Sequence, residues 1–222
     1  FSNIMLGWSA ELALTITLSF ALIHTLKSGI KGVVILDVLH FSAGTISTTL
    51  LAVLILVQVG GPTELASQIT ASADAPAGVL DMFPDLSHIG ATEMISFVCL
   101  IGVLWLGQAQ GDGYIVQRLF SAKSEKHAIK ASLWFAVAGV VIITWPWIVV
   151  GLGSIVILPI SEASTALILD PELAYPMMIM EVLPAGLKGL LVAAFMAAFM
   201  STVDTHLCWG GSYMVNDIYK RF

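Results

Sequence analysis

The 222-residue chain is 58% hydrophobic and 11% charged, with a mean hydropathy of +0.94 and a formal net charge of −6. Soluble domains average roughly 45–50% apolar and about 25% charged residues. The composition therefore excludes an ordinary soluble domain and favours an integral membrane protein. Because the chain lacks an initiating Met and begins inside an apolar stretch, we expect it to be a piece of a longer protein.

Five stretches are apolar enough to be membrane-spanning helices: residues 4–26, 33–59, 93–107, 131–157 and 187–207. A spanning helix needs about 20 apolar residues, and only 93–107 falls short of that length. The longest connection, 60–92, is rich in Gly, Pro, Ser and acidic residues, and we expect it to be a long outer loop. The pattern predicts one all-α transmembrane domain over residues 1–222.

The basic residues predict the orientation of these spans. Eight of the nine Lys and Arg lie on alternate connections or after the last span, and hence on one side: Lys27, Lys31, Arg118, Lys123, Lys126, Lys130, Lys220 and Arg221. Only Lys188 falls on the other side. Since Lys and Arg are enriched on the cytoplasmic side of membrane proteins, we expect a multi-pass protein whose C-terminal end here is cytoplasmic.

A glycine-rich break follows the short third span. Glycine lets the backbone leave a helix, and a helix unwinds at membrane depth only where it lines protein or water. We therefore predict a helix broken near 107–113 that presents a polar surface to a solute, as transporters do. The alternative is an ordinary helix end followed by a cytoplasmic loop. The residues concerned are Gln108, Gln110, Gly111, Asp112 and Gly113.

The last span carries an unusual number of oxygen-bearing side chains in FMAAFMSTVDTH. Its spacing of three and four places Ala198, Ser201, Thr202 and Thr205 on one helical face. Carbonyl and hydroxyl oxygens suit a hard cation such as Na⁺. For a single Ser or Thr, the alternative is a bond back to the preceding turn of the helix. Asp204 and Thr205 are candidates for a second cation site or a proton site.

Motifs of other function classes are missing from the sequence. We find no Cys/His spacing typical of a metal site, no phosphate-binding loop and no nucleophile elbow. We expect no metal ion beyond Na⁺. The basic residues are scattered and form no surface for nucleic acid. We therefore expect neither an enzyme nor an organic cofactor.

Three segments resemble the sodium:solute symporter family. GIKGVVILDVLH is similar to that family's GG-x-x-x-V-x-x-TD-x-x-Q signature, and DGYIVQRLFSAKSEKHAIK resembles its D-x-x-x-VQR-x-x-x-AK segment. The gapless run from AYPMMIMEVLPAGL to VNDIYKRF resembles the stretch through the family's eighth core helix. The resemblance covers most of 29–222 and leaves the connection 60–92 unmatched. It implies the five-plus-five inverted-repeat transporter fold, with core helices four to eight in this chain, in a bacterial inner membrane.

The resemblance also implies roles for individual residues. In the family, Na⁺ binds between core helices one and eight, and the ligands of the eighth helix carry over to Ala198, Ser201 and Thr202. The acid of the signature lies on the inner exit path of the ion, and here it is Asp37. Asp112 matches the acid after the broken helix. The implied function is Na⁺-coupled symport of a small organic solute, with the lipid bilayer and the rest of the transporter chain or other membrane subunits as partners.

Several positions depart from the family pattern. His40 replaces the Gln of the signature, Cys208 replaces an Asn, and Asp204 stands where a hydroxyl is common. Ala109 and Gly139 stand where sugar-transporting members carry an aromatic residue and a Lys, which argues against a sugar substrate. Asp204 is therefore the residue most able to distinguish this protein from its relatives.

Two function classes stay open on the sequence. The first is Na⁺-coupled symport of a small solute. The second is a non-transporting accessory or structural subunit of a larger membrane complex, because the chain holds only half of the implied ion site. A proton-conducting antiporter-like subunit would need a Lys in mid-span, and the sequence has none there.

Overall fold

The computed structural model describes residues 2–73, 75–81, 83, 90–104, 113–158, 167 and 170–222. Three runs within them are long and apolar enough to cross a membrane: Ala10–Val59, Glu125–Ile157 and Ala185–Tyr219. The regular elements of the described residues are all helical, which confirms the predicted all-α membrane class. They are α1 Ser2–Leu6, α2 Ala10–Val59, α3 Pro62–Ala71, α4 Ala91–Cys99, η1 Leu100–Leu104, α6 Gly113–Phe120, α7 Glu125–Val137, η2 Ala138–Ile143, α8 Thr144–Ile157, η3 Pro171–Leu173, α10 Ala174–Val182, α11 Ala185–Tyr213 and η4 Met214–Tyr219.

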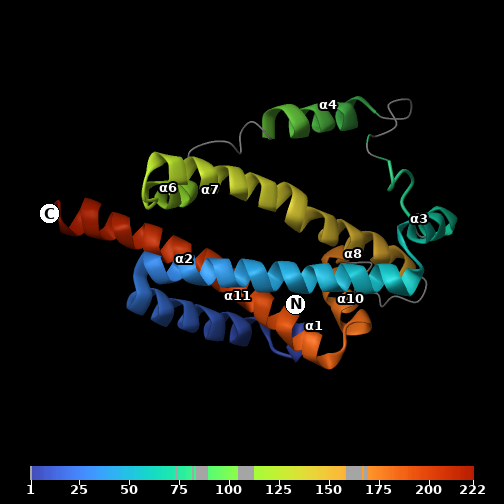
Figure 1. Cartoon of the computed structure of the whole chain (residues 1–222), viewed down its shortest axis with the longest axis horizontal. Helices are drawn as coiled ribbons and strands as arrows, with labels where there is room; N and C mark the ends of the chain where they lie inside the picture. The colour runs from blue at the N-terminus through green and yellow to red at the C-terminus, as the bar shows by residue number, and fades with distance from the viewer. Residues whose placement is uncertain are drawn as a thin grey trace.

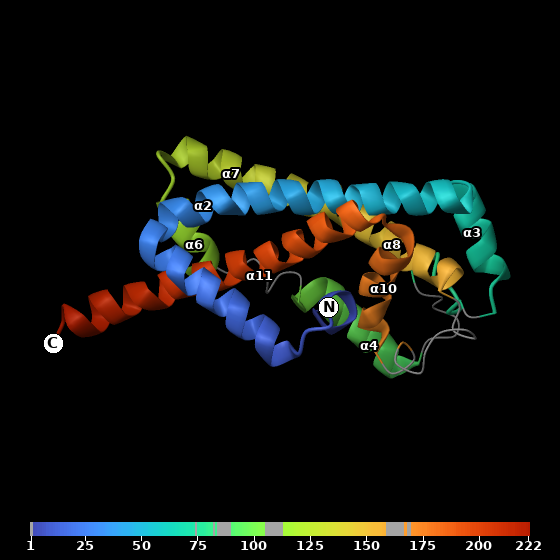
Figure 2. The ribbon, with the colours of Figure 1, turned by 90° about the horizontal axis from the view of Figure 1, so that it is seen from below.

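The 50-residue α2 consists of two helices joined at Gly29, whose backbone has φ 56° and ψ −163°. Figures 1 and 2 show the chain turning back on itself at this point. We call residues 10–28 the first leg and residues 30–59 the second leg. They fall on the first two predicted spans, and α2 is the main packing partner of α11.

Replacing Gly29 by Ala is expected to destabilise the fold. The φ/ψ combination of Gly29 is essentially reserved for Gly, and a side chain there costs about 1–3 kcal/mol. No atom lies within 4 Å of a Cβ built at Gly29, so the cost arises from the backbone alone. The matched control is Gly44→Ala, in open space within the helical second leg, where Ala is the better helix former by about 1 kcal/mol. The thermal unfolding midpoint in detergent measures both; a midpoint for Gly29→Ala at or above that of Gly44→Ala contradicts the expectation.

The apolar core lies at the end of the molecule away from Gly29. Buried side chains there come from five helices: Leu51 and Ile55 of α2, Leu65 and Ile69 of α3, Val150 of α8, Met178 and Ile179 of α10, and Leu191 of α11. Helices α3 and α10 lie in segments that the sequence predicts to be connections. Pro62 starts α3, and the spacing of Leu65 and Ile69 buries one face of this helix.

Large apolar side chains cover much of the outer surface. Leu26, Val57 and Phe135 are each more than 70% exposed. An exposed apolar surface of this extent is typical of a chain that faces lipid or other membrane helices. Figure 1 shows α4 standing apart from the other helices, while α2, α8, α10 and α11 form the packed body.

Candidate cation site

The three predicted cation ligands occupy neighbouring turns of α11. Ser201 is half-buried, whereas Ala198 and Thr202 are exposed. The Thr202 hydroxyl donates to the Ala198 carbonyl oxygen at 3.2 Å, which is the bond back to the preceding turn considered above. Ser201 instead turns its hydroxyl toward another helix. Ser201 therefore connects the predicted ligand set to the rest of the fold.

Asp37, on the second leg of α2, is the centre of a cluster that joins three helices. Ser201 donates to its Oδ1. Arg118 of α6 pairs with its Oδ2 at 2.7 Å and also donates to the Thr205 hydroxyl at 2.6 Å. The Thr205 hydroxyl donates in turn to the Ser201 carbonyl oxygen at 2.9 Å. We call Asp37, Arg118, Ser201 and Thr205 the Asp37 cluster.

Asp204 belongs to a second cluster, with the first leg of α2. Its side chain is buried, and its Oδ1 accepts a hydrogen bond from the Thr25 hydroxyl at 2.7 Å. The Nδ1 atom of His24 lies 3.0 Å from Oδ2. Because a carboxylate only accepts hydrogen bonds, we assign the proton of this contact to Nδ1. The bonds from His24 and Thr25 compensate the burial of a charged group. We call Asp204, His24 and Thr25 the Asp204 cluster.

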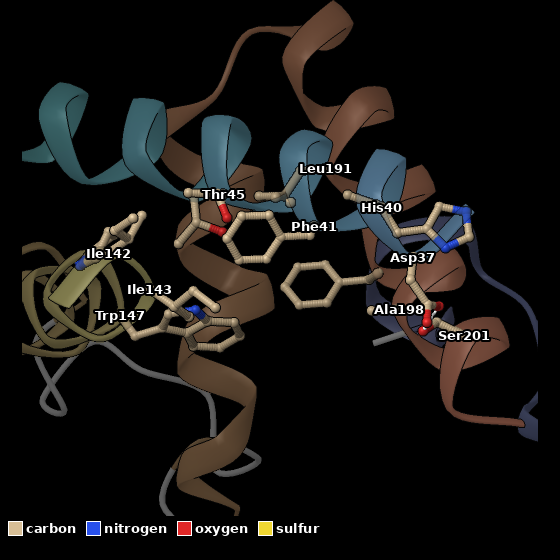
Figure 3. A pocket seen from close by; sticks show the side chains of 15 residues that line it. Asp37, His40, Phe41, Thr45, Ile142, Ile143, Trp147, Leu191, Ala198 and Ser201 are labelled. Carbon is tan, nitrogen blue, oxygen red and sulfur yellow. Dashed lines mark hydrogen bonds between the residues drawn. The ribbon is translucent and has the colours of Figure 1, made fainter. Parts of the chain in front are cut away.

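A cavity of about 260 Å³ opens beside Ser201, between the second leg of α2, the η2–α8 junction and α11. Figure 3 shows Asp37 and Ser201 facing each other at one end, with Ile142 at the other. The Nδ1 atom of His40, which also lines the cavity, is buried and has no hydrogen-bond partner among the described residues. Most of the remaining lining is apolar or aromatic.

Stacked aromatic rings support the wall of this cavity. Trp147 stacks on Tyr175 with ring centres 4.3 Å apart, and both rings meet Phe195 edge-on. Tyr175 donates to the Thr48 hydroxyl at 3.4 Å. Burial raises the pKa of Tyr175 above its ordinary value, so the phenol keeps the proton that it donates. Ring packing and the partly buried hydrogen bond to Thr48 therefore hold the wall.

The structure separates two residues that the sequence groups together. Asp204 turns to the first leg of α2, whereas Thr205 turns to Arg118. Of the predicted broken helix, only Gly113 is described, and it begins α6. The predicted residues Gln108, Gln110, Gly111 and Asp112 lie outside the described residues, as does Ala109.

Three residues of the two clusters are not predicted from the sequence. In the sequence, Arg118 is one of several basic residues of a connection, whereas in the structure it forms an ion pair with Asp37. His24 and Thr25 stand at the end of the first predicted span, where a polar residue usually faces the interface. The only available signal is that His24, Thr25 and Ser28 share a helical face.

Comparisons with known proteins give a consistent result. The profile of the sodium:solute symporter family matches residues 1–222. A sodium/glucose cotransporter of Vibrio parahaemolyticus is 29% identical over 91% of this chain and 39% of its own length. A sodium/mannose cotransporter of Bos taurus is 26% identical over 100% of this chain and 40% of its own length. A sodium/myo-inositol cotransporter of Mus musculus is 26% identical over 97% of this chain and 34% of its own length. The chain thus spans about two fifths or less of the length of these relatives. No solved structure is significantly similar to it.

Proposed function

Because the chain belongs to the sodium:solute symporter family, we propose that its protein carries a small organic solute across a membrane together with Na⁺. The contact between Ser201 and Asp37 supports this most, because it brings an acid from α2 against the oxygen-bearing face of α11. The family is one of transporters, which favours transport over an enzymatic reaction.

In this proposal Na⁺ binds to the carbonyl oxygen of Ala198 and to the hydroxyls of Ser201 and Thr202. These oxygen ligands suit a hard cation. Further ligands come from the first core helix of the fold, which these 222 residues do not include. Asp37 lies directly beside Ser201 and receives the ion on its way to the cytoplasm. Ion binding favours one access state because the complete ligand set exists only in that state.

We keep residues 107–113 as the solute-binding segment predicted from the sequence, and among the described residues the cavity beside Ser201 is the candidate space for the solute. The cavity has a volume of about 260 Å³, near the lower end of the roughly 300–1,000 Å³ of common small-molecule sites. The relatives are named for glucose, mannose and myo-inositol. Ala109 and Gly139 argue for a solute other than a sugar, so both classes belong in a test.

The proposed topology has five crossings of a bacterial plasma membrane, with the C-terminal end in the cytoplasm. The turn at Gly29, helix α6, the start of α7 and the C-terminal end lie at one end of the molecule in Figure 1. The segments that carry Lys27, Lys31 and Lys123 therefore lie on the same side. Because basic residues are enriched on the cytoplasmic side of membrane proteins, this supports the proposal that this end of the molecule faces the cytoplasm.

We further propose that Asp204 or Thr205 provides a second cation site or a proton site. Asp204 is a buried carboxylate, which is costly inside a membrane protein and is usually retained for a function. Its neighbour at 3.0 Å is His24, and histidine is a common proton carrier in proteins.

Solute uptake tests the proposed function. The intact protein is reconstituted into liposomes, and uptake of labelled glucose, mannose, myo-inositol, an amino acid and a monocarboxylate is measured under an inward Na⁺ or choline gradient. We expect Na⁺ to stimulate uptake of at least one solute about ten-fold or more, and a sodium ionophore to abolish the stimulation. Equal uptake with choline contradicts the coupling. No uptake of any solute by folded protein supports the accessory-subunit alternative.

A further inference from the structure

We propose that the guanidinium group of Arg118 competes with the transported Na⁺ for the carboxylate of Asp37, and so links ion release to movement of α6. This inference rests on the proposed function, because it requires a cation at Ser201. Arg118 is a positioning residue in this role, since it acts on the ion through Asp37.

In the Asp37 cluster, one carboxylate contacts both Ser201, the proposed Na⁺ ligand, and the positively charged Arg118. One oxygen of Asp37 accepts from Ser201, and the other accepts from Arg118 at 2.7 Å. Arg118 also binds the Thr205 hydroxyl, one helical turn beyond Ser201 on α11. The guanidinium group thus lies among carboxylate and hydroxyl oxygens, which are atoms of the kind that bind cations.

Electrostatics makes the two cations antagonists. A Na⁺ ion at Ser201 and the guanidinium group at Asp37 are like charges a few ångströms apart. The side chains of Arg118 and Asp37 are only 29% and 22% exposed, so water and salt screen the repulsion less than at an open surface. Asp204, which neighbours Thr205 on α11, is paired with His24. Each cation therefore weakens the binding of the other, and the coupling is reciprocal.

The position of Arg118 in the chain gives this competition a mechanical consequence. Arg118 belongs to the eight-residue α6, which begins at Gly113. Gly113 is also the last residue of the segment 107–113, which the sequence predicts to take part in solute binding. When Na⁺ moves onto Asp37, it repels the guanidinium group of Arg118 and weakens the ion pair between α6 and α2. Release of the ion is thereby connected to the position of α6.

Variants of Arg118 test the competition by equilibrium binding of radioactive Na⁺ and by uptake kinetics on the intact protein. Arg118→Gln frees the Asp37 carboxylate, so we expect the Kd for Na⁺ to fall about ten-fold and the maximal uptake rate to fall as well, because the ion leaves more slowly. Arg118→Lys keeps a positive charge and is expected to stay within about three-fold of wild type. Lys123→Gln is the matched control: it removes the same charge from an exposed position just after α6, and its Kd should not change.

Two further variants separate this role from a structural one. In an Asp37→Asn background, Arg118→Gln should have no further effect on the Kd, because the competition acts through Asp37. Thr205→Val removes the hydroxyl that Arg118 binds besides Asp37, and it should lower the Kd for Na⁺ about three-fold. This variant tests the competition if Arg118→Gln fails to fold. An unchanged or raised Kd in folded Arg118→Gln or Thr205→Val overturns this inference alone. A wild-type protein that binds no Na⁺ overturns the proposed function and the inference with it.

Discussion

Replacing Ser201 and Thr202 together by Ala is expected to raise the half-saturating Na⁺ concentration of uptake about a hundred-fold. A hydrogen bond or ligand contact to a charged group contributes about 1.5–3 kcal/mol, so the loss of two hydroxyls removes at least about 3 kcal/mol of ion binding. Every 1.4 kcal/mol is about ten-fold in affinity. The measurement is the Na⁺ dependence of initial uptake rates in liposomes.

The single variants assign the effect to the ion site. Thr202 is exposed, and its hydroxyl donates to the Ala198 carbonyl oxygen of its own helix. Thr202→Ala should therefore weaken Na⁺ dependence without lowering the unfolding midpoint. Ser212→Ala removes a hydroxyl from the same helix, one that bonds to the Trp209 carbonyl at 2.7 Å, and serves as the control. A double variant within two-fold of wild type contradicts the assignment of Ser201 and Thr202.

Asp204→Ala is expected to cause the largest loss of stability among the variants considered. Asp204 is 1% exposed and accepts hydrogen bonds from two residues of the first leg of α2. Breaking a buried charged contact by removing one partner costs about 3–5 kcal/mol. Asp204→Asn keeps the shape and one acceptor for Thr25, so we expect about half of that loss. Thermal unfolding in detergent measures both, with Asp217→Ala, an exposed acid near the C-terminal end, as the control.

The Asn variant also tests whether Asp204 has a role in transport. If Asp204 provides a second cation or proton site, Asp204→Asn changes the Hill coefficient for Na⁺ or the pH dependence of uptake. A stable Asp204→Asn protein in which both quantities equal those of wild type refutes the second site and leaves Asp204 as a structural contact between α2 and α11.

The sequence predicts the parts of this fold that depend on composition and on one helix at a time. The apolar runs predict the membrane class, and the spacing of Ala198, Ser201 and Thr202 predicts their shared face on α11. Family resemblance singles out Asp37, which lies against Ser201 in the structure, and its role on the ion path stays a prediction. In each case the information lies within a short segment, so no knowledge of tertiary packing is needed.

Contacts between segments that are distant in the sequence cannot be predicted from one short segment at a time. Arg118 looks like an ordinary cytoplasmic charge, because nothing in its neighbours indicates that it pairs with an acid 81 positions earlier. Asp204 and Thr205 are adjacent in sequence, yet successive helical residues point about 100° apart and reach different partners. The reversal at Gly29 also depends on tertiary structure, since only the packing of both legs on α11 requires a turn of one residue.

Equilibrium binding of radioactive Na⁺ to the purified, intact protein tests the central claim most directly, because it needs no knowledge of the solute. We predict saturable Na⁺ binding by wild type and by Ser212→Ala, and loss of that binding in Ser201→Ala/Thr202→Ala. Saturable binding of equal affinity in the double variant, or no saturable binding by folded wild-type protein, contradicts a sodium site on α11.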